Sequence, residues 1–209
     1  MPVVPLPAAL GPVLDWLNLA GTAVFAMSGA MLAAEKKQTF VTCAFFAVVT
    51  GVGGGTVRDL LIGAPVFWVH HNATLLICLG AAAIVWLLSE RLWPTRALLW
   101  FDAAGLAAFA AYGAAKGLAF GLAPIPAVGM GVLTGCLGGI IRDVLAGEPS
   151  ILMRPELYVT VAALSAALFV GLNYAGVPGG AAGLIAALAG FAVRGVAIWR
   201  GWSLPAYSR

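Results

Sequence analysis

Two short segments hold the residues best suited to chemistry, and each combines glycines with an adjacent Arg–Asp pair. They read Gly53-Gly54-Gly55-Thr56-Val57-Arg58-Asp59 and Gly138-Gly139-Ile140-Ile141-Arg142-Asp143. Both lie inside long apolar stretches, where ionisable groups are costly and usually face a bundle interior or an aqueous cavity. Consecutive glycines in a helix interior also cost about 1 kcal/mol each relative to alanine. These residues indicate a site that interacts with ions. They do not form a set of catalytic residues.

A hydroxyl, a glycine and a cation recur along one helical stripe in each segment. A spacing of four residues places Thr50, Gly54 and Arg58 on one face of a helix. Thr134, Gly138 and Arg142 repeat this spacing in the second segment. Carbonyls freed at a glycine break can replace the hydration oxygens of a cation. We therefore predict a narrow waist lined by Thr50, Gly53, Gly54, Gly55, Thr134, Gly138 and Gly139. The alternative is that these glycines only let helices pack closely.

The Arg–Asp pairs are predicted to lie near opposite mouths of this waist. At 1.5 Å per residue Arg58 lies about 27 Å beyond Phe40, close to the far edge of an apolar core about 30 Å thick. The same count puts Arg142 near the other edge. Cross-pairs of Arg58 with Asp143, or of Arg142 with Asp59, are therefore not expected. Either arginine could instead extend to the membrane interface.

Two further ionisable residues are candidates for attracting ions or for gating. Asp102 is a candidate cation-attracting group, with a residue near a helix start as the alternative. Lys116 is either a gating charge or an ordinary flanking residue. The glycine segment lacks the Lys-Ser/Thr of a phosphate-binding loop, and no metal-ligand spacing or nucleophile–base set is present. An enzyme, a cofactor, and a metal other than permeating ions are not expected.

The whole chain is too apolar for a soluble domain. Of its 209 residues 62% are hydrophobic and 9% charged, against about 25% charged in soluble domains. Crossing a core about 30 Å thick takes about 20 apolar residues. Seven stretches approach this length: 13–34, 40–61, 73–89, 97–115, 124–146, 157–173 and 179–199. We predict an all-α integral membrane protein with a single membrane domain over residues 1–209.

The sequence repeats itself without gaps at an offset of 84 residues. Residues 13–89 overlay 97–173, and the glycine–Arg–Asp segments are the most specific match. Each repeat holds three spans, an odd number, so the second copy must be inverted across the membrane. Inverted repeats are typical of transporter folds, with the pathway at their interface. The helix at 179–199 stands outside the duplication and either closes the bundle or packs on a neighbouring subunit.

The distribution of lysine and arginine predicts the orientation. One side of the predicted membrane carries eight of them, and Lys116 is alone on the other when the two motif arginines are set aside. The eight are Lys36, Lys37, Arg91, Arg96, Arg154, Arg194, Arg200 and Arg209. Positive residues favour the cytoplasm, which places the N-terminus outside and the C-terminus inside. This bias accounts for the pI of about 9.0, and nucleic acid is not an expected partner.

The doubled motif, the three-plus-three inverted helices and the seventh helix resemble the prokaryotic trimeric intracellular cation (TRIC) channel family. The resemblance implies a homotrimer in the lipid of a prokaryotic inner membrane. It implies one hourglass pore per subunit that passes monovalent cations, chiefly K⁺ and also Na⁺. The family's constriction lies where the second and fifth helices kink at their glycines. Here the second copy has two glycines, Gly138 and Gly139, where the first has three.

Two other functions fit parts of the pattern. Closely related bacterial sequences have been grouped as transporters of small solutes such as glycine, and inverted repeats suit alternating access. A channel has weak, multiple sites and passes ions rapidly, whereas a transporter saturates and couples its substrates. A non-conducting assembly protein would leave the buried Arg and Asp groups without a purpose. The sequence favours the cation channel.

Overall fold

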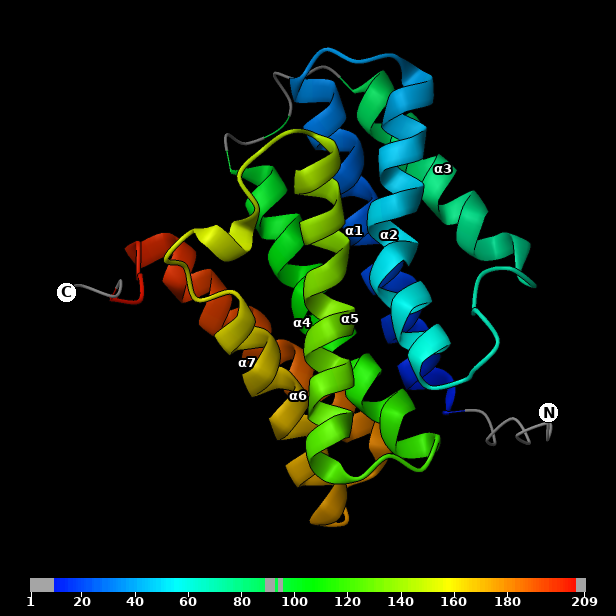
Figure 1. Ribbon diagram of the computed structural model, residues 1–209, viewed down its shortest axis with the longest axis vertical. Helices are drawn as coiled ribbons and strands as arrows, with labels where there is room; N and C mark the ends of the chain where they lie inside the picture. The colour runs from blue at the N-terminus through cyan, green and yellow to red at the C-terminus, as the bar shows by residue number, and fades with distance from the viewer. Residues whose placement is uncertain (1–9, 89–92, 94–95, 206–209) are drawn as a thin grey trace.

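The protein is a bundle of seven α-helices in its computed structural model, which describes residues 10–88, 93 and 96–205 (Figure 1). The helices match the predicted spans to within four residues at each described end. The predicted end at residue 89 lies outside the described residues. The elements are α1 Pro12–Glu35, α2 Phe40–Leu61, α3 Asn72–Leu87, α4 Ala97–Ala119, α5 Pro124–Leu145, the short 3-10 helix η2 Ile151–Met153, α6 Val159–Tyr174 and α7 Gly179–Arg200.

The helices that carry the two motifs end in the same way. Gly63 follows α2 with φ 67°, and Gly147 follows α5 with φ 69°. These left-handed residues let the next amide close the helix: Ala64 N donates to Asp59 O at 2.8 Å, and Glu148 N donates to Asp143 O at 2.9 Å. Glycine has no Cβ to oppose this conformation, which is why it is the usual residue there. The chain therefore turns away immediately after each Arg–Asp pair.

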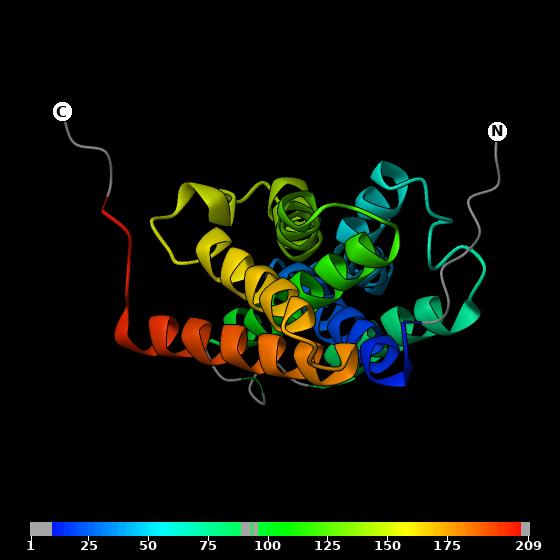
Figure 2. The same cartoon turned by 90° about the horizontal axis from the view of Figure 1, so that it is seen from below.

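Helices α1 and α4 form the centre of the bundle. They contact each other, and each also contacts its repeat neighbours: α2 and α3 for α1, α5 and α6 for α4. Helices α2 and α5 lie beside each other on one side of this centre, and α7 runs along the opposite side (Figures 1 and 2). Helix α7 packs on α4, α6 and α1, so it closes the bundle within one subunit.

Paired contacts between α1 and α4 make the inverted repeat visible in the packing. A Cβ at Gly21 would lie 2.8 Å from the ring of Phe109, and one at Gly105 would lie 2.7 Å from the ring of Phe25. These four positions exchange at the 84-residue offset. The two rings also meet each other, with centroids 5.3 Å apart. The predicted architecture of two inverted three-helix repeats and a seventh helix is confirmed.

Five of the described helices are long and apolar enough to cross a membrane: α1, α2, α4, α5 and α7. Helices α3 and α6 have 16 residues each, or about 24 Å, which is short of a core about 30 Å thick. Large apolar side chains such as Trp16, Val41, Ile125 and Trp199 are strongly exposed on the surface of the subunit. Such a surface fits a protein whose solvent is lipid.

The connections follow the inverted topology. The α1–α2 and α5–α6 connections lie at the same end of the bundle, where Lys36 Nζ is 2.6 Å from Glu148 Oε1 (Figure 1). Arg96 donates to Ile198 O at the end of α7 nearby, at 3.3 Å. Lys116 lies toward the opposite end. Lys36 and Arg96 therefore lie at one end of the bundle and Lys116 toward the other, while Arg91 and Arg209 lie outside the described residues.

The Lys36–Glu148 pair leads to a prediction about pH. The hydrogen bond from Lys36 holds the pKa of Glu148 below its ordinary value of 4.5. A depressed folded-state pKa adds stability above the unfolded pKa, and this is lost as pH falls through the folded pKa. We expect Glu148→Gln to lower Tm slightly at pH 7, with no difference from the wild type well below pH 4.5. The difference should also shrink at 1 M salt, where charges on the surface are screened. A Tm difference that persists at low pH would contradict this account.

Candidate functional site

Helices α2 and α5 touch backbone to backbone at their glycines. The Thr134 carbonyl oxygen lies against the Cα of Gly54, where a Cβ would collide with it. The pseudo-symmetric contact has the Thr50 carbonyl oxygen 2.5 Å from the position of a Cβ on Gly138. Both threonines are fully buried. Four of the seven predicted waist residues therefore meet at one crossing.

The predicted helix breaks are not present. Residues 40–61 and 124–145 are α-helical throughout, so the carbonyls at the glycines are not released for ion binding. The physical reason is that these glycines supply close approach, the alternative that the sequence left open. The remaining glycines have other neighbours: a Cβ at Gly53 would meet Ile141, one at Gly55 would meet Phe67, and one at Gly139 would meet Tyr158.

Arg58 and Asp59 are buried together with Lys116 near one end of this crossing. Arg58 Nε donates to Asp59 Oδ1 at 2.8 Å, and Lys116 Nζ lies 2.8 Å from the same oxygen. Asp59 Oδ2 accepts from the backbone N of Phe67 at 2.9 Å. The Arg58 guanidinium also lies over the ring of Tyr112, 5.1 Å from its centroid. We call Arg58, Asp59, Lys116 and Tyr112 the repeat-one cluster.

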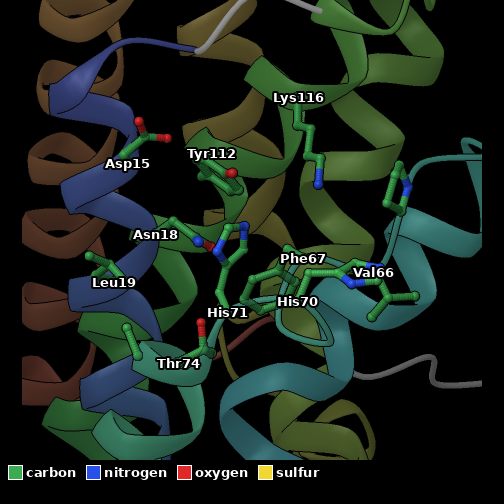
Figure 3. Close-up of a pocket in the computed structure, with 12 residues that line it drawn as sticks. Asp15, Asn18, Leu19, Val66, Phe67, His70, His71, Thr74, Tyr112 and Lys116 are labelled. Carbon is green, nitrogen blue, oxygen red and sulfur yellow. The ribbon is translucent and has the colours of Figure 1, made fainter. Parts of the chain in front are cut away.

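A cavity of about 480 Å³ opens beside the repeat-one cluster (Figure 3). Lys116 and Tyr112 extend toward it from α4, and Asp15 and Asn18 from α1. His70 and His71, which the sequence analysis did not use, line it from the α2–α3 connection. Water-sized molecules can reach the Lys116 ammonium through this cavity. This end of the crossing is therefore a polar vestibule.

Arg142 and Asp143 form the matching group near the other end. Arg142 Nη2 donates to Asp143 Oδ1 at 2.8 Å, and its Nη1 donates to Asp102 Oδ1 at 2.7 Å and to Ser28 Oγ at 3.0 Å. Asp143 Oδ2 accepts from the backbone N of Ile151 at 3.0 Å, as Asp59 does from its own loop. We call Arg142, Asp143, Asp102 and Ser28 the repeat-two cluster. A cavity of about 310 Å³ reaches Arg142 and Asp143.

The two clusters share a backbone frame but carry opposite formal charge. The repeat-one cluster has two cations and one carboxylate, because Asn18 stands where the other repeat has Asp102. The repeat-two cluster has one cation and two carboxylates, because Leu32 stands where the other repeat has Lys116. Each cluster therefore holds one unbalanced charge, positive in the first and negative in the second.

Several alternatives from the sequence are settled by these positions. Neither motif arginine extends to the interface, because Arg58 is 0% exposed and Arg142 is 2% exposed. Asp102 lies buried within α4 and is no residue of a helix start, and Lys116 is paired and buried and no ordinary flank. In the described part of the chain each motif arginine pairs with the aspartate that follows it, and the two cross-pairs do not form.

The sequence missed a second layer behind the repeat-two cluster. Arg194 of α7 was assigned to the cytoplasmic flank, but it is buried. It donates to Glu156 Oε2 at 2.5 Å and lies over the ring of Tyr158, 5.6 Å from the centroid. The offset of 84 could have identified Ser28 and Tyr112, which occupy equivalent positions. It could not identify Arg194, which lies outside the duplication.

Comparisons with known proteins identify a family of membrane proteins. A family model described as "Glycine transporter" matches residues 15–90 and 99–174, which are the two repeats. A UPF0126 membrane protein of Vibrio cholerae is 43% identical over 149 residues, covering 69% of this chain and 62% of the relative. The UPF0126 inner membrane protein YadS of Escherichia coli K12 is 41% identical over 150 residues, covering 69% of this chain and 72% of the relative. The chain thus spans less than two thirds of the Vibrio protein's length.

A solved structure extends the similarity to nearly the whole chain. The TRIC trimeric intracellular cation channel orthologue from Rhodobacter sphaeroides has a TM-score of 0.84 and 40% sequence identity. The match covers 91% of this chain and 99% of that channel. These relatives are described as membrane proteins, a transporter family and a cation channel, in agreement with a chain that carries no enzyme motif.

Proposed function

We propose a cation channel function for this chain, which belongs to the family described as "Glycine transporter" and shares the fold of the prokaryotic TRIC channels. The proposed activity is passage of monovalent cations, K⁺ and also Na⁺, through one hourglass pore in each subunit. The observation that carries it is the α2–α5 crossing. At this crossing the helices touch backbone to backbone, and the two buried charged clusters near its ends each adjoin a cavity.

The crossing is proposed as the constriction of this pore in a closed form. Thr50, Gly54, Thr134 and Gly138 lie in contact there and are buried, so ions would pass only after α2 and α5 separate. The Arg–Asp pairs would then line the two approaches. Asp102 would attract cations on one side, and Lys116 would act as a gating charge on the other.

The assembly proposed is a homotrimer in a prokaryotic inner membrane. The similar channel from Rhodobacter sphaeroides is described as trimeric, and YadS is described as an inner membrane protein. Exposed apolar side chains cover the subunit, as expected for surfaces that meet lipid or other subunits. The lysine and arginine asymmetry supports an external N-terminus and a cytoplasmic C-terminus.

Purified protein in planar bilayers tests the proposal directly. Under asymmetric KCl we expect discrete unitary currents that reverse near the K⁺ equilibrium potential. The same preparation in liposomes should show no saturable uptake of labelled glycine. Silent bilayers together with saturable, ion-coupled glycine uptake would establish the transporter instead, the function that the family's description names.

The hydroxyl of Thr50 provides a test of the pathway itself. Thr50 Oγ1 is buried and makes no hydrogen bond among the described residues. This hydroxyl faces Gly29 of α1, and the Thr50 carbonyl faces Gly138. Thr50→Val should therefore leave the protein as stable as the wild type but lower its unitary conductance if the hydroxyl lines the open pathway. Thr22→Val on α1, outside the proposed waist, serves as the control and should conduct normally. A Thr50→Val channel with wild-type conductance would remove Thr50 from the pathway.

A further inference from the structure

Asp102 has one carboxylate oxygen that the protein does not satisfy. Its side chain is about 1% exposed, and Oδ1 accepts the Nη1 hydrogen bond of Arg142 at 2.7 Å. Oδ2 is buried and has no hydrogen-bond partner among the described residues. A buried acceptor left alone costs about 1–3 kcal/mol, and more when it is charged. A polar or cationic group is therefore expected beside Oδ2.

The hydroxyl of Tyr158 is the second unsatisfied group in the same place. Tyr158 is about 1% exposed, and its Oη also lacks a hydrogen-bond partner in the described part of the chain. Both groups border Gly139: a Cβ there would lie 2.5 Å from Tyr158 Oη and 3.1 Å from Asp102 Oδ1. The missing side chain at Gly139 brings Tyr158 Oη and Asp102 Oδ1 close to the backbone of α5, and the unsatisfied Oδ2 belongs to the same Asp102 carboxylate.

The local charge decides which kind of group belongs there. The repeat-two cluster has one guanidinium and two carboxylates, and an arginine stays protonated in proteins. The nearby Arg194 and Glu156 pair with each other at 2.5 Å and so cancel. One negative charge remains in a buried setting, where a single positive charge would balance it.

We propose that Asp102 Oδ2 and Tyr158 Oη bind a monovalent cation beside Gly139. The proposal rests on the proposed function only for the identity of the ion, which would be the permeating K⁺. A monovalent ion balances the single net negative charge of the repeat-two cluster, whereas a divalent ion such as Ca²⁺, which usually binds several carboxylates, would leave an excess positive charge. The 310 Å³ cavity reaches Arg142, the hydrogen-bond partner of Asp102, so solvent comes within one side chain of the proposed site.

The equivalent place in repeat one is built differently. At the 84-residue offset, Asn18 occupies the position equivalent to Asp102, and Thr74 occupies the position equivalent to Tyr158. A Cβ at Gly55 would meet the Phe67 ring, where the other repeat presents two oxygens. The Lys116 ammonium already gives this half its extra positive charge. The cation site is therefore specific to repeat two, which makes repeat one an internal control.

Rubidium, a K⁺ analogue that scatters anomalously, is the probe. Crystals of the full-length protein grown in RbCl should show an anomalous peak in contact with Asp102 Oδ2 and Tyr158 Oη, and none at Asn18 and Thr74. A non-anomalous density at Asp102 would mean that water satisfies these oxygens, and that result would overturn the proposal. So would a map with no density there.

Equilibrium binding of ⁸⁶Rb⁺ to the purified protein tests the ligands. Asp102→Asn should weaken binding at least tenfold, and Tyr158→Phe, which keeps the Arg142–Asp102 pair, should weaken it severalfold. Thr74→Val should bind Rb⁺ like the wild type. If Asp102→Asn does not fold, Tyr158→Phe carries the test, and unchanged binding in that variant overturns the proposal. A wild type that conducts without binding Rb⁺ refutes this site alone, whereas one that binds Rb⁺ without conducting refutes the channel.

Discussion

Gly54→Ala is expected to lower stability by about 1–3 kcal/mol or to prevent folding, although it adds a single methyl group. The new Cβ would collide with the Thr134 carbonyl oxygen, which belongs to the backbone of α5 and cannot rotate away. The two helices would have to separate and lose the packing around the crossing. Thermal denaturation in detergent, followed by size-exclusion chromatography, measures the effect. Any folded fraction should have an altered conductance, since the helices would no longer touch at the proposed constriction.

Gly53→Ala is the matched control one residue earlier. Its Cβ would meet only the Cδ1 atom of Ile141 at 3.0 Å, the end of a side chain that can adjust. Alanine also favours a helix interior by about 1 kcal/mol over glycine, which offsets the tight contact. We expect a Tm near that of the wild type. Equal losses at Gly53 and Gly54 would mean that general helix effects, and not the backbone contact, account for the result.

The second large effect is expected for Asp59→Asn, at about 3–5 kcal/mol. Asp59 is fully buried and its carboxylate is the shared partner of Arg58 and Lys116. The amide would leave two cations close together with no negative charge between them. Removing one of them should recover part of the loss, so the double variant with Lys116→Leu should have a higher Tm than Asp59→Asn alone.

Asp143→Asn is the control that the duplication provides. Its partner Arg142 would keep a second ion pair, with Asp102, whose Oδ1 lies 2.7 Å from Arg142 Nη1. The loss of Tm should therefore be clearly smaller than for Asp59→Asn, although both aspartates end the same motif and accept a hydrogen bond from equivalent loop amides, those of Phe67 and Ile151. If the two substitutions cost the same, the charge imbalance between the clusters does not control stability.

Much of the fold could be predicted because a membrane restricts the choices. Apolar runs of about 20 residues have few alternatives to helices there, and the ungapped 84-residue repeat required an inverted second half. The limits of α2 at Phe40 and Leu61 were predicted to the residue. The role of the glycines could not be predicted, because a glycine that breaks a helix and a glycine that admits a neighbouring backbone look alike in a sequence. Only the position of the Thr134 carbonyl distinguishes them.

The candidate site was predicted in its parts but not in its connections. The sequence identified the ionisable residues because charge is rare in an apolar chain. It placed Asp102 and Lys116 without partners, since pairing across helices depends on the rotation of each helix about its axis. The bond from Arg142 to Asp102 spans 40 residues, and the pair of Arg194 with Glu156 joins the unduplicated α7 to the loop before α6. Neither follows from spacing.

The opposite charges of the two clusters give a nearly symmetric backbone an electrical direction. On the proposed pathway, an ion that entered beside Lys116 would meet a net positive group first and a net negative group second, and an ion travelling the other way would meet them in reverse. Turned over in the bilayer, the same molecule would present the opposite sequence of charges to the cell. The orientation of insertion would therefore affect how the proposed channel handles ions, and positions 18, 32, 102 and 116 are where the charges of the two clusters differ.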